Sequence, residues 1–203
     1  MHPTTPISEG AQRILRIAAP LFAQKGFNGV SINDIAEAVG GSKANIFHHF
    51  PNKQALYLAA LGSACESFRG ELGKTEASGA DDTSPGTIAS RHLDRMLADP
   101  NSARLVLREA FAGDKGQDRA RVAEILHQNF SRLVAEVEQA QPRGRACKGT
   151  DPAMVALAVI ALNNLLFQSW SVLERFEEFR HFASPQALAE AAINAIARGS
   201  QQP

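Results

Sequence analysis

The chain has little of the chemistry that would mark a secreted protein, a metalloprotein or a membrane protein. Its 203 residues include two cysteines, Cys65 and Cys147, and neither belongs to a CxxC pair or a Cys/His cluster. We therefore expect free thiols in a reducing, cytoplasmic compartment, and no metal or other cofactor. The N-terminal segment lacks the pattern of a signal peptide, and we see no run of about 18 apolar residues that would cross a membrane.

An excess of charge of either sign is also missing. The 21 Lys and Arg residues balance the 21 Asp and Glu residues, so the formal net charge is zero. Residues 1–60 carry five basic and three acidic side chains, which is a small excess. This distribution predicts few phosphate contacts per subunit, so tight binding to a nucleic acid would need a dimer.

Signatures of catalysis are missing as well. The sequence has no GxSxG, no HExxH, no paired Cys/His arrangement and no phosphate-binding loop, so we do not expect an enzyme. His48 and His49 are adjacent, but neighbouring residues on a helix diverge by about 100°. They are therefore poorly placed to hold one metal ion together.

The most informative stretch is residues 31–56, SINDIAEAVGGSKANIFHHFPNKQAL, which predicts two short helices and the start of a third. Ser31 and Asp34 have the spacing of a capping box at the start of the first helix. Gly40 can take the left-handed conformation that ends a helix, and Ser42 can cap the next one.

The second of these helices has two distinct faces. Ile46 and Phe50 share one face, whereas Ala44 and Phe47 lie on the other, with Lys43 at the start. Its short length and small, polar first turn are typical of the recognition helix of a helix-turn-helix, which reads base edges in the major groove.

The pattern IAxxVGGSKANIFHHFxxKxxL resembles the DNA-binding signature of the TetR family of bacterial transcriptional regulators, and LFAQKGFNGVS before it fits as well. The resemblance covers residues 11–58. It implies an all-α protein of about nine helices, in agreement with the absence of alternating strand patterns. Residues 1–52 would form a three-helix DNA-binding domain, and residues 53–203 a helical effector-binding and dimerisation domain. The implied function is that of a repressor that binds a near-palindromic DNA operator as a homodimer and is released by a small-molecule effector.

Carried over position by position, the resemblance also implies DNA contacts. Ser31 and Ile32 would lie against the backbone, and Lys53 would hold a phosphate. Phe47 stands where the family usually has Tyr, so a hydroxyl that could bond a phosphate is missing, and Gly41 stands where Val is usual. The residues that would face the operator are Ser42, Lys43, Ala44, Asn45, Phe47, His48 and His49.

The end of the chain predicts a dimer interface. Met154–Leu173 is apolar nearly all round, and a further apolar helix starts after Ser184, which is more apolar surface than a small domain should bury. The alternative is that both helices pack entirely within one subunit. The resemblance likewise implies that the last two helices pair with their copies in a second subunit.

The resemblance further implies an effector cavity among the middle helices. An apolar or aromatic molecule would suit a pocket with few polar groups. The aromatic candidates could instead be ordinary core residues, Arg108 could form a surface ion pair, and the amides could bond between helices or subunits. The candidates are Arg108, Phe111, Phe130, Asn163, Phe167, Gln168 and Trp170.

Two other ways of regulating the same fold stay open. Cys147 lies among Arg143, Arg145 and Lys148, a setting that favours a reactive thiolate and would suit a redox sensor. Alternatively, a protein partner could gate the regulator, or it could bind DNA constitutively, without any small-molecule ligand.

Overall fold

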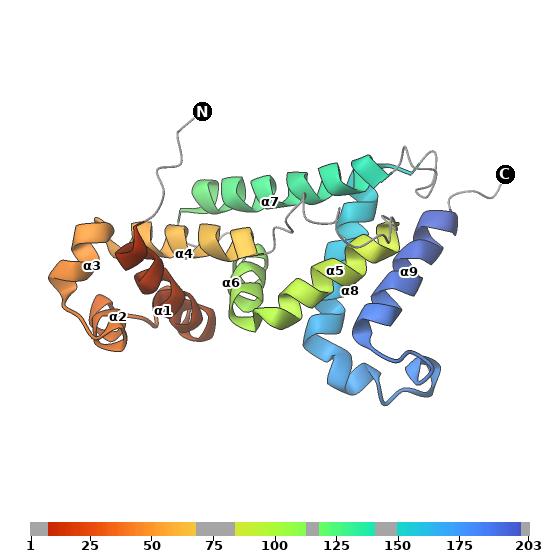
Figure 1. Ribbon diagram of the computed structural model, residues 1–203, viewed down its shortest axis with the longest axis horizontal. Coiled ribbons are helices and arrows are strands. Elements are labelled where there is room, and N and C mark those ends of the chain that lie inside the picture. The colour runs from red at the N-terminus through yellow and green to blue at the C-terminus, as the bar shows by residue number, and fades with distance from the viewer. Residues whose placement is uncertain (1–7, 68–83, 113–117, 141–149, 200–203) are drawn as a thin grey trace. The chain divides into compact units, whose positions relative to one another are not determined.

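The computed structural model describes residues 8–67, 84–112, 118–140 and 150–199. Within these ranges the regular structure is entirely helical, which confirms the predicted all-α class and the expected nine α-helices. A short 3-10 helix, Glu177–Phe179, lies before the last α-helix. The α-helices are α1 (Glu9–Lys25), α2 (Ile32–Val39), α3 (Lys43–His49), α4 (Lys53–Ser67), α5 (Pro85–Ala98), α6 (Pro100–Ala110), α7 (Arg119–Ala140), α8 (Pro152–Leu173) and α9 (Pro185–Gly199) (Figure 1).

The chain divides into two compact units. The first unit comprises Met1–Ser67 and Pro100–Leu126, and the second comprises Phe68–Asp99 and His127–Pro203. The first unit therefore holds α1–α4, α6 and the first residues of α7, whereas α5, the rest of α7, α8 and α9 belong to the second. The boundary predicted after residue 52 separates DNA binding from effector binding and dimerisation, and not two compact units. It stays a prediction.

The first unit is built around the apolar stripe of α1. Ile14, Leu15, Ala18 and Phe22 recur at helical spacing, and each is at most 3% exposed. Helices α2, α3, α4 and α6 contact α1, so this stripe forms the centre of one continuous core. The other members of that core that are at most 2% exposed are Val30, Ile35, Ile46, Leu56, Tyr57, Ala60, Leu61, Ala64, Leu105 and Val122.

Short-range signals in the sequence set several helix starts. The side chains of Ser8, Asp151 and Ser184 accept hydrogen bonds, 2.8–3.3 Å long, from backbone N–H groups two or three residues further on. Pro152 and Pro185 occupy the first position of their helices, where a missing N–H costs nothing. These local contacts fix where α1, α8 and α9 begin.

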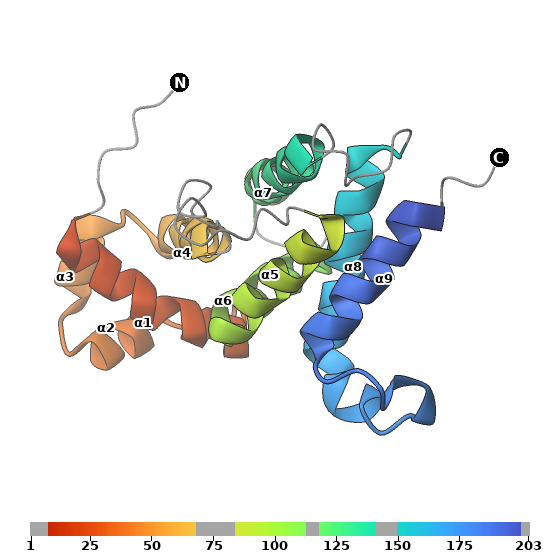
Figure 2. The same ribbon diagram turned by 45° about the vertical axis from the view of Figure 1, so that its right-hand side comes forward.

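In the second unit, α5, α8 and α9 lie side by side (Figures 1 and 2). The backbone N–H of Gly86 donates to Asn194 Oδ1 at 3.0 Å, and a Cβ at Gly86 would lie only 2.4 Å from Asn194 Nδ2. This glycine therefore lets α5 and α9 approach closely. One turn further along α5, Asn163 Nδ2 of α8 donates to the carbonyl of Ala89 at 2.9 Å.

Helix α8 is long and apolar enough to cross a membrane by length and composition alone, contrary to the expectation that no segment would be. The core helix of a water-soluble domain passes the same test, and α8 contacts both α5 and α9 and bonds to α5 through a buried amide. Only 28% of the most apolar 18-residue stretch of α8 is buried, however. Its large exposed apolar side chains are Met154, Leu157, Leu165 and Val172.

Candidate nucleic-acid interface

Helix α2 and the turn after it have the predicted caps. Ser31 Oγ accepts from the N–H of Asp34 at 3.1 Å, and Asp34 Oδ2 accepts from the N–H of Ser31 at 2.8 Å, which completes a capping box. These bonds from Ser31 lower the pKa of the Asp34 carboxyl. Gly40 has φ 69° and ends the helix in the left-handed region, where a side chain would be strained. The turn into α3 is thus fixed by its own residues.

Helix α3 is attached to the core by one face and exposes the other. Ile46 has no exposed surface and Phe50, just after the helix, is 8% exposed, whereas Phe47 is 45% exposed. Ser42 Oγ caps the helix by accepting from the N–H of Asn45 at 3.2 Å. Phe50 is already extended, which ends the helix before Pro51. Ser31, Ser42, Lys43, Ala44, Asn45, Phe47 and His48 are all exposed, in keeping with the predicted DNA-facing surface.

Two residues of this region have intramolecular roles that the sequence did not predict. His49 is half-buried, with Nδ1 3.4 Å from Ser8 Oγ, and its ring covers Gly10, where a Cβ would lie 2.8 Å from Nε2. Arg13 Nη2 donates to the carbonyl of Val39 at 2.9 Å and so holds the end of α2 to α1. Both side chains support the recognition helix, and a DNA contact by His49 stays a prediction.

Lys53, the predicted phosphate contact, lies at the start of α4. Its Nζ is 4.3 Å from the centroid of the Phe27 ring, which is a cation–π geometry. Asn52 Oδ1 caps the helix by accepting from the N–H of Ala55 at 2.8 Å. Ile32 is half-buried against the core, so its side chain helps to fix α2, and its contact with the DNA backbone stays a prediction.

Two of the predicted effector residues, Arg108 and Phe111, belong to the first compact unit, and both side chains are exposed. Phe111 is 70% exposed at the end of α6. The guanidinium of Arg108 lies over Gly26, where an added Cβ would be 2.3 Å from Nη2. Gly26 is the C-cap of α1, so the positive charge lies where helix carbonyls favour it.

The remaining effector candidates belong to the second unit. Asn163 is fully buried, and its Nδ2 contacts His92 Nδ1 at 3.0 Å as well as the carbonyl of Ala89. In the part of the chain that the structure describes, its Oδ1 has no hydrogen-bond partner. Burial, and then the charge of Arg95, lower the pKa of His92 to about 4, so this imidazole is neutral near pH 7. Phe130, Phe167 and Trp170 are half-buried, whereas Gln168 is exposed and bonds to Asn164.

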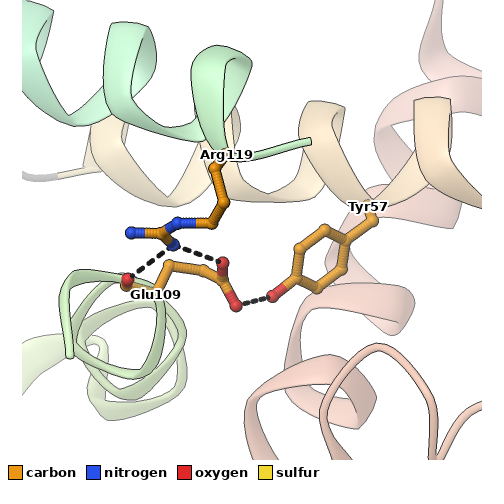
Figure 3. A network of polar contacts seen from close by, with 3 residues as sticks. All are labelled: Tyr57, Glu109 and Arg119. Atoms are coloured by element: carbon orange, nitrogen blue, oxygen red, sulfur yellow. Dashed lines mark hydrogen bonds and ion pairs between the residues drawn. The ribbon is translucent and has the colours of Figure 1, made fainter. Parts of the chain in front are cut away.

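Sequence reasoning missed a buried polar cluster that joins α4, α6 and α7. The Tyr57 hydroxyl donates to Glu109 Oε1, and Arg119 lies beside the same glutamate (Figure 3). Glu109 is 5% exposed and follows Leu105 and Val106 on the apolar face of α6. An acid on an otherwise apolar helical stripe is the signal that could have identified it.

The described residues contain no group of three or more His, Cys, Asp or Glu side chains placed to hold a metal ion. Cys65 is a buried thiol in the core of the first unit, a position that does not favour reaction with oxidants. Cys147, the other candidate for a redox role, lies outside the described residues.

Comparison with known sequences matches the same segment. Residues 14–60 match the profile of the family described as bacterial regulatory proteins, tetR family. A segment of 55 residues is 44% identical to the HTH-type transcriptional regulator RutR of Escherichia coli K12, which covers 27% of this chain and 26% of that protein. The similarity therefore spans about a quarter of the length of this curated relative.

Comparison with solved structures extends the likeness to most of the chain. A protein described as a TetR-family transcriptional regulator from Rhodococcus sp. superposes with a TM-score of 0.70 at 26% identity, over 93% of this chain and 98% of that one. The regulator FadR from Bacillus subtilis, solved in complex with stearoyl-CoA, has a TM-score of 0.64 over 93% and 98% of the two chains. At 16% identity, FadR shares the fold alone.

Proposed function

The first unit of this chain carries the DNA-binding domain of the tetR family, and on this premise we propose that the protein is a transcriptional repressor that binds its operator as a homodimer. A small-molecule effector would release it from the DNA. The observation that carries the proposal is the exposed face of α3.

That face has the properties required to read a major groove. Helix α3 is seven residues long and is anchored through Ile46, so it can enter the groove without leaving the core. Lys43 and Asn45 lie in its first turn, and such side chains bond to phosphates and base edges. Phe47 adds exposed apolar surface, which suits contact with a thymine methyl group.

A single copy of this surface would bind weakly. Arg13 is used to join α1 to α2, so few cations besides Lys43 and Lys53 remain for phosphates. Two copies on one DNA face, about 34 Å apart, would meet successive major grooves. We therefore propose a dimer that reads a near-palindromic site.

The second unit supplies the surface for that dimer. Leu157, Leu165 and Val172 of α8 and Ile196 of α9 are each at least 50% exposed. Soluble proteins rarely leave such a row of large apolar side chains in water, so it marks a surface that a partner covers. A second copy of α8 and α9 would cover it in the arrangement implied by the family resemblance.

The effector site is proposed for the second unit as well. Asn163 Oδ1 is a buried acceptor that no described residue satisfies, and a ligand with a hydrogen-bond donor would satisfy it. The surrounding half-buried rings, Phe167 and Trp170, favour an apolar or aromatic molecule. Fatty acids, acyl-CoA thioesters and aromatic acids form a suitable first panel.

Fluorescence anisotropy tests the proposal directly. The protein would be titrated onto the duplex upstream of its own gene and onto a scrambled duplex, at about 50 and about 200 mM salt. We expect selective binding with a shallow salt dependence. Equal binding to the scrambled duplex and to a duplex selected by the protein from a random pool would contradict sequence-specific DNA binding.

The same complex then serves to find the effector. An effector should displace the labelled duplex and raise the melting temperature of the free protein, because it binds only the folded state. A compound that raises the melting temperature without displacing DNA would be a ligand but not an inducer.

A further inference from the structure

The buried cluster of Tyr57, Glu109 and Arg119 ties together three helices of the first unit (Figure 3). Tyr57 is 1% exposed on α4, and its hydroxyl donates to Glu109 Oε1 of α6. Arg119 Nη1, from the start of α7, donates to the backbone carbonyl of Glu109 at 3.3 Å and lies 3.8 Å from Oε2. The end of α6 is thus held from two sides by side chains far apart in sequence.

This arrangement joins the helices at a cost in the stability of the fold. Glu109 is 5% exposed, and its Oε2 has no hydrogen-bond partner in the part of the chain that the structure describes. A buried acid with incomplete partners stabilises a fold less than apolar side chains of similar size would. It does, however, restrict geometry, because the Tyr57 hydroxyl has to point at Glu109 Oε1 to donate this bond. Burial, and then the bond to Glu109, raise the pKa of that hydroxyl.

The same tyrosine contacts the region that faces DNA. Its ring meets Phe22 edge-on, with centroids 4.9 Å apart, and Phe27 with centroids 5.2 Å apart. The Phe27 ring in turn contacts Lys53, whose Nζ is 4.3 Å from the ring centroid. Lys53 is four residues before Tyr57, one turn along α4, and only three residues separate α4 from α3.

We propose that Tyr57, Glu109 and Arg119 are positioning residues for sequence-specific DNA binding. The bond between Tyr57 and Glu109 fixes the first half of α4 on α6. Phe27, which contacts both Tyr57 and Lys53, then fixes the position of Lys53 relative to α4. The three-residue connection from α3 to α4 fixes the recognition helix in the same way. This inference rests on the proposed DNA-binding function and adds the residues that position the recognition helix, α3, and Lys53.

The test compares selectivity with stability in matched variants. The parent protein first selects a duplex from a random pool, and every variant is then titrated onto that duplex and onto a scrambled one at a single salt concentration. Tyr57→Phe removes only the hydroxyl, whereas Leu61→Val removes one carbon from an equally buried position on the same helix. A double variant, Tyr57→Phe with Glu109→Leu, replaces both bonded partners by apolar groups.

We expect Tyr57→Phe to lower the ratio of the two affinities about tenfold, the size that the loss of one hydrogen bond to a charged group allows. Leu61→Val should lower the melting temperature by a similar amount and keep the parent ratio. The double variant should regain melting temperature, because no buried polar group is left unpaired, and should keep the low ratio.

Two results would overturn the inference alone: a parent-like ratio in Tyr57→Phe, or a double variant that regains both the ratio and the melting temperature. A parent protein that selects no duplex would instead overturn the proposed function, and the inference with it.

Discussion

The two compact units differ in how completely each covers its own apolar surface. In the first unit, the described residues that leave a large apolar side chain exposed are Phe47 and Phe111, and Phe47 lies on the proposed DNA face. In the second unit, exposed apolar side chains recur along α8 and continue to Phe176 and Ile196.

This difference distinguishes a unit that buries its apolar surface within one chain from a unit that leaves an apolar face uncovered. The first unit exposes polar groups on α3 above one continuous core. The second combines the uncovered apolar face with Asn163 Oδ1, a buried acceptor for which the described residues provide no hydrogen-bond donor. Stability of the fold and affinity for DNA should therefore respond to substitutions in different places.

The largest expected effect comes from breaking the core of the first unit. Phe22→Ala removes a fully buried ring that contacts Tyr57 and should lower the free energy of unfolding by about 3–5 kcal/mol. Phe111→Ala is the matched control, since that ring is 70% exposed and its loss should change stability by less than about 0.5 kcal/mol. Urea unfolding followed by circular dichroism measures both, and similar midpoints would contradict the difference in burial.

Acid should destabilise the second unit through His92. Its folded pKa, about 4, lies below the ordinary value of 6.5, so the unfolded chain binds more protons between these two values. Stability is therefore full above pH 6.5 and falls as the pH drops toward 4, by up to about 3 kcal/mol. Urea unfolding at pH 7 and pH 5 measures this loss, and His92→Gln should reduce it. An unchanged pH dependence in that variant would assign the effect to other groups.

A charge on the uncovered face of α8 should separate the subunits. Leu165→Glu leaves the core of the monomer intact, because Leu165 is 52% exposed, but opposes burial of that face in a dimer. Loss of the second recognition helix should weaken operator binding about 100-fold. Sedimentation velocity and anisotropy measure the two effects. Gln128→Glu, at an exposed position of α7, should change neither, and a dimeric Leu165→Glu would place the interface elsewhere.

The smallest effect is expected on the DNA-facing surface of the first unit. Lys43→Ala or His48→Ala should weaken operator binding about tenfold while stability and dimerisation stay unchanged. Lys25→Ala removes an equally exposed charge at the end of α1 and provides the control. If the α3 variants bind as tightly as the parent, α3 is not the recognition helix.

Features that depend on neighbouring residues could be predicted from the sequence. The capping box of Ser31 and Asp34 and the left-handed Gly40 involve partners within four residues, so local chemistry determines them. The apolar character of α8 is also local. The same holds for the exposed residues of α3, whose alternation with Ile46 and Phe50 follows from helical spacing.

Contacts between distant residues could not be predicted in this way. The partners Tyr57 and Glu109 are 52 residues apart, and Asn163 reaches Ala89 across 74 residues. Helical periodicity says which face is buried but not which helix covers it. For the same reason the contact between His49 and Ser8, 41 residues apart, could not be predicted from the place of His49 in the motif.

The first unit is discontinuous in sequence, and this has a consequence for the order of synthesis. Leu105 and Val122 complete the core that α1 and α4 begin, yet the ribosome makes α5, a helix of the other unit, between these parts. At roughly 5–20 residues per second, several seconds pass between the appearance of α4 and that of α7. Until α6 has been made, the face of α4 around Tyr57 lacks its partner from that helix. The core of the first unit is therefore completed only after more than half of the chain has been made.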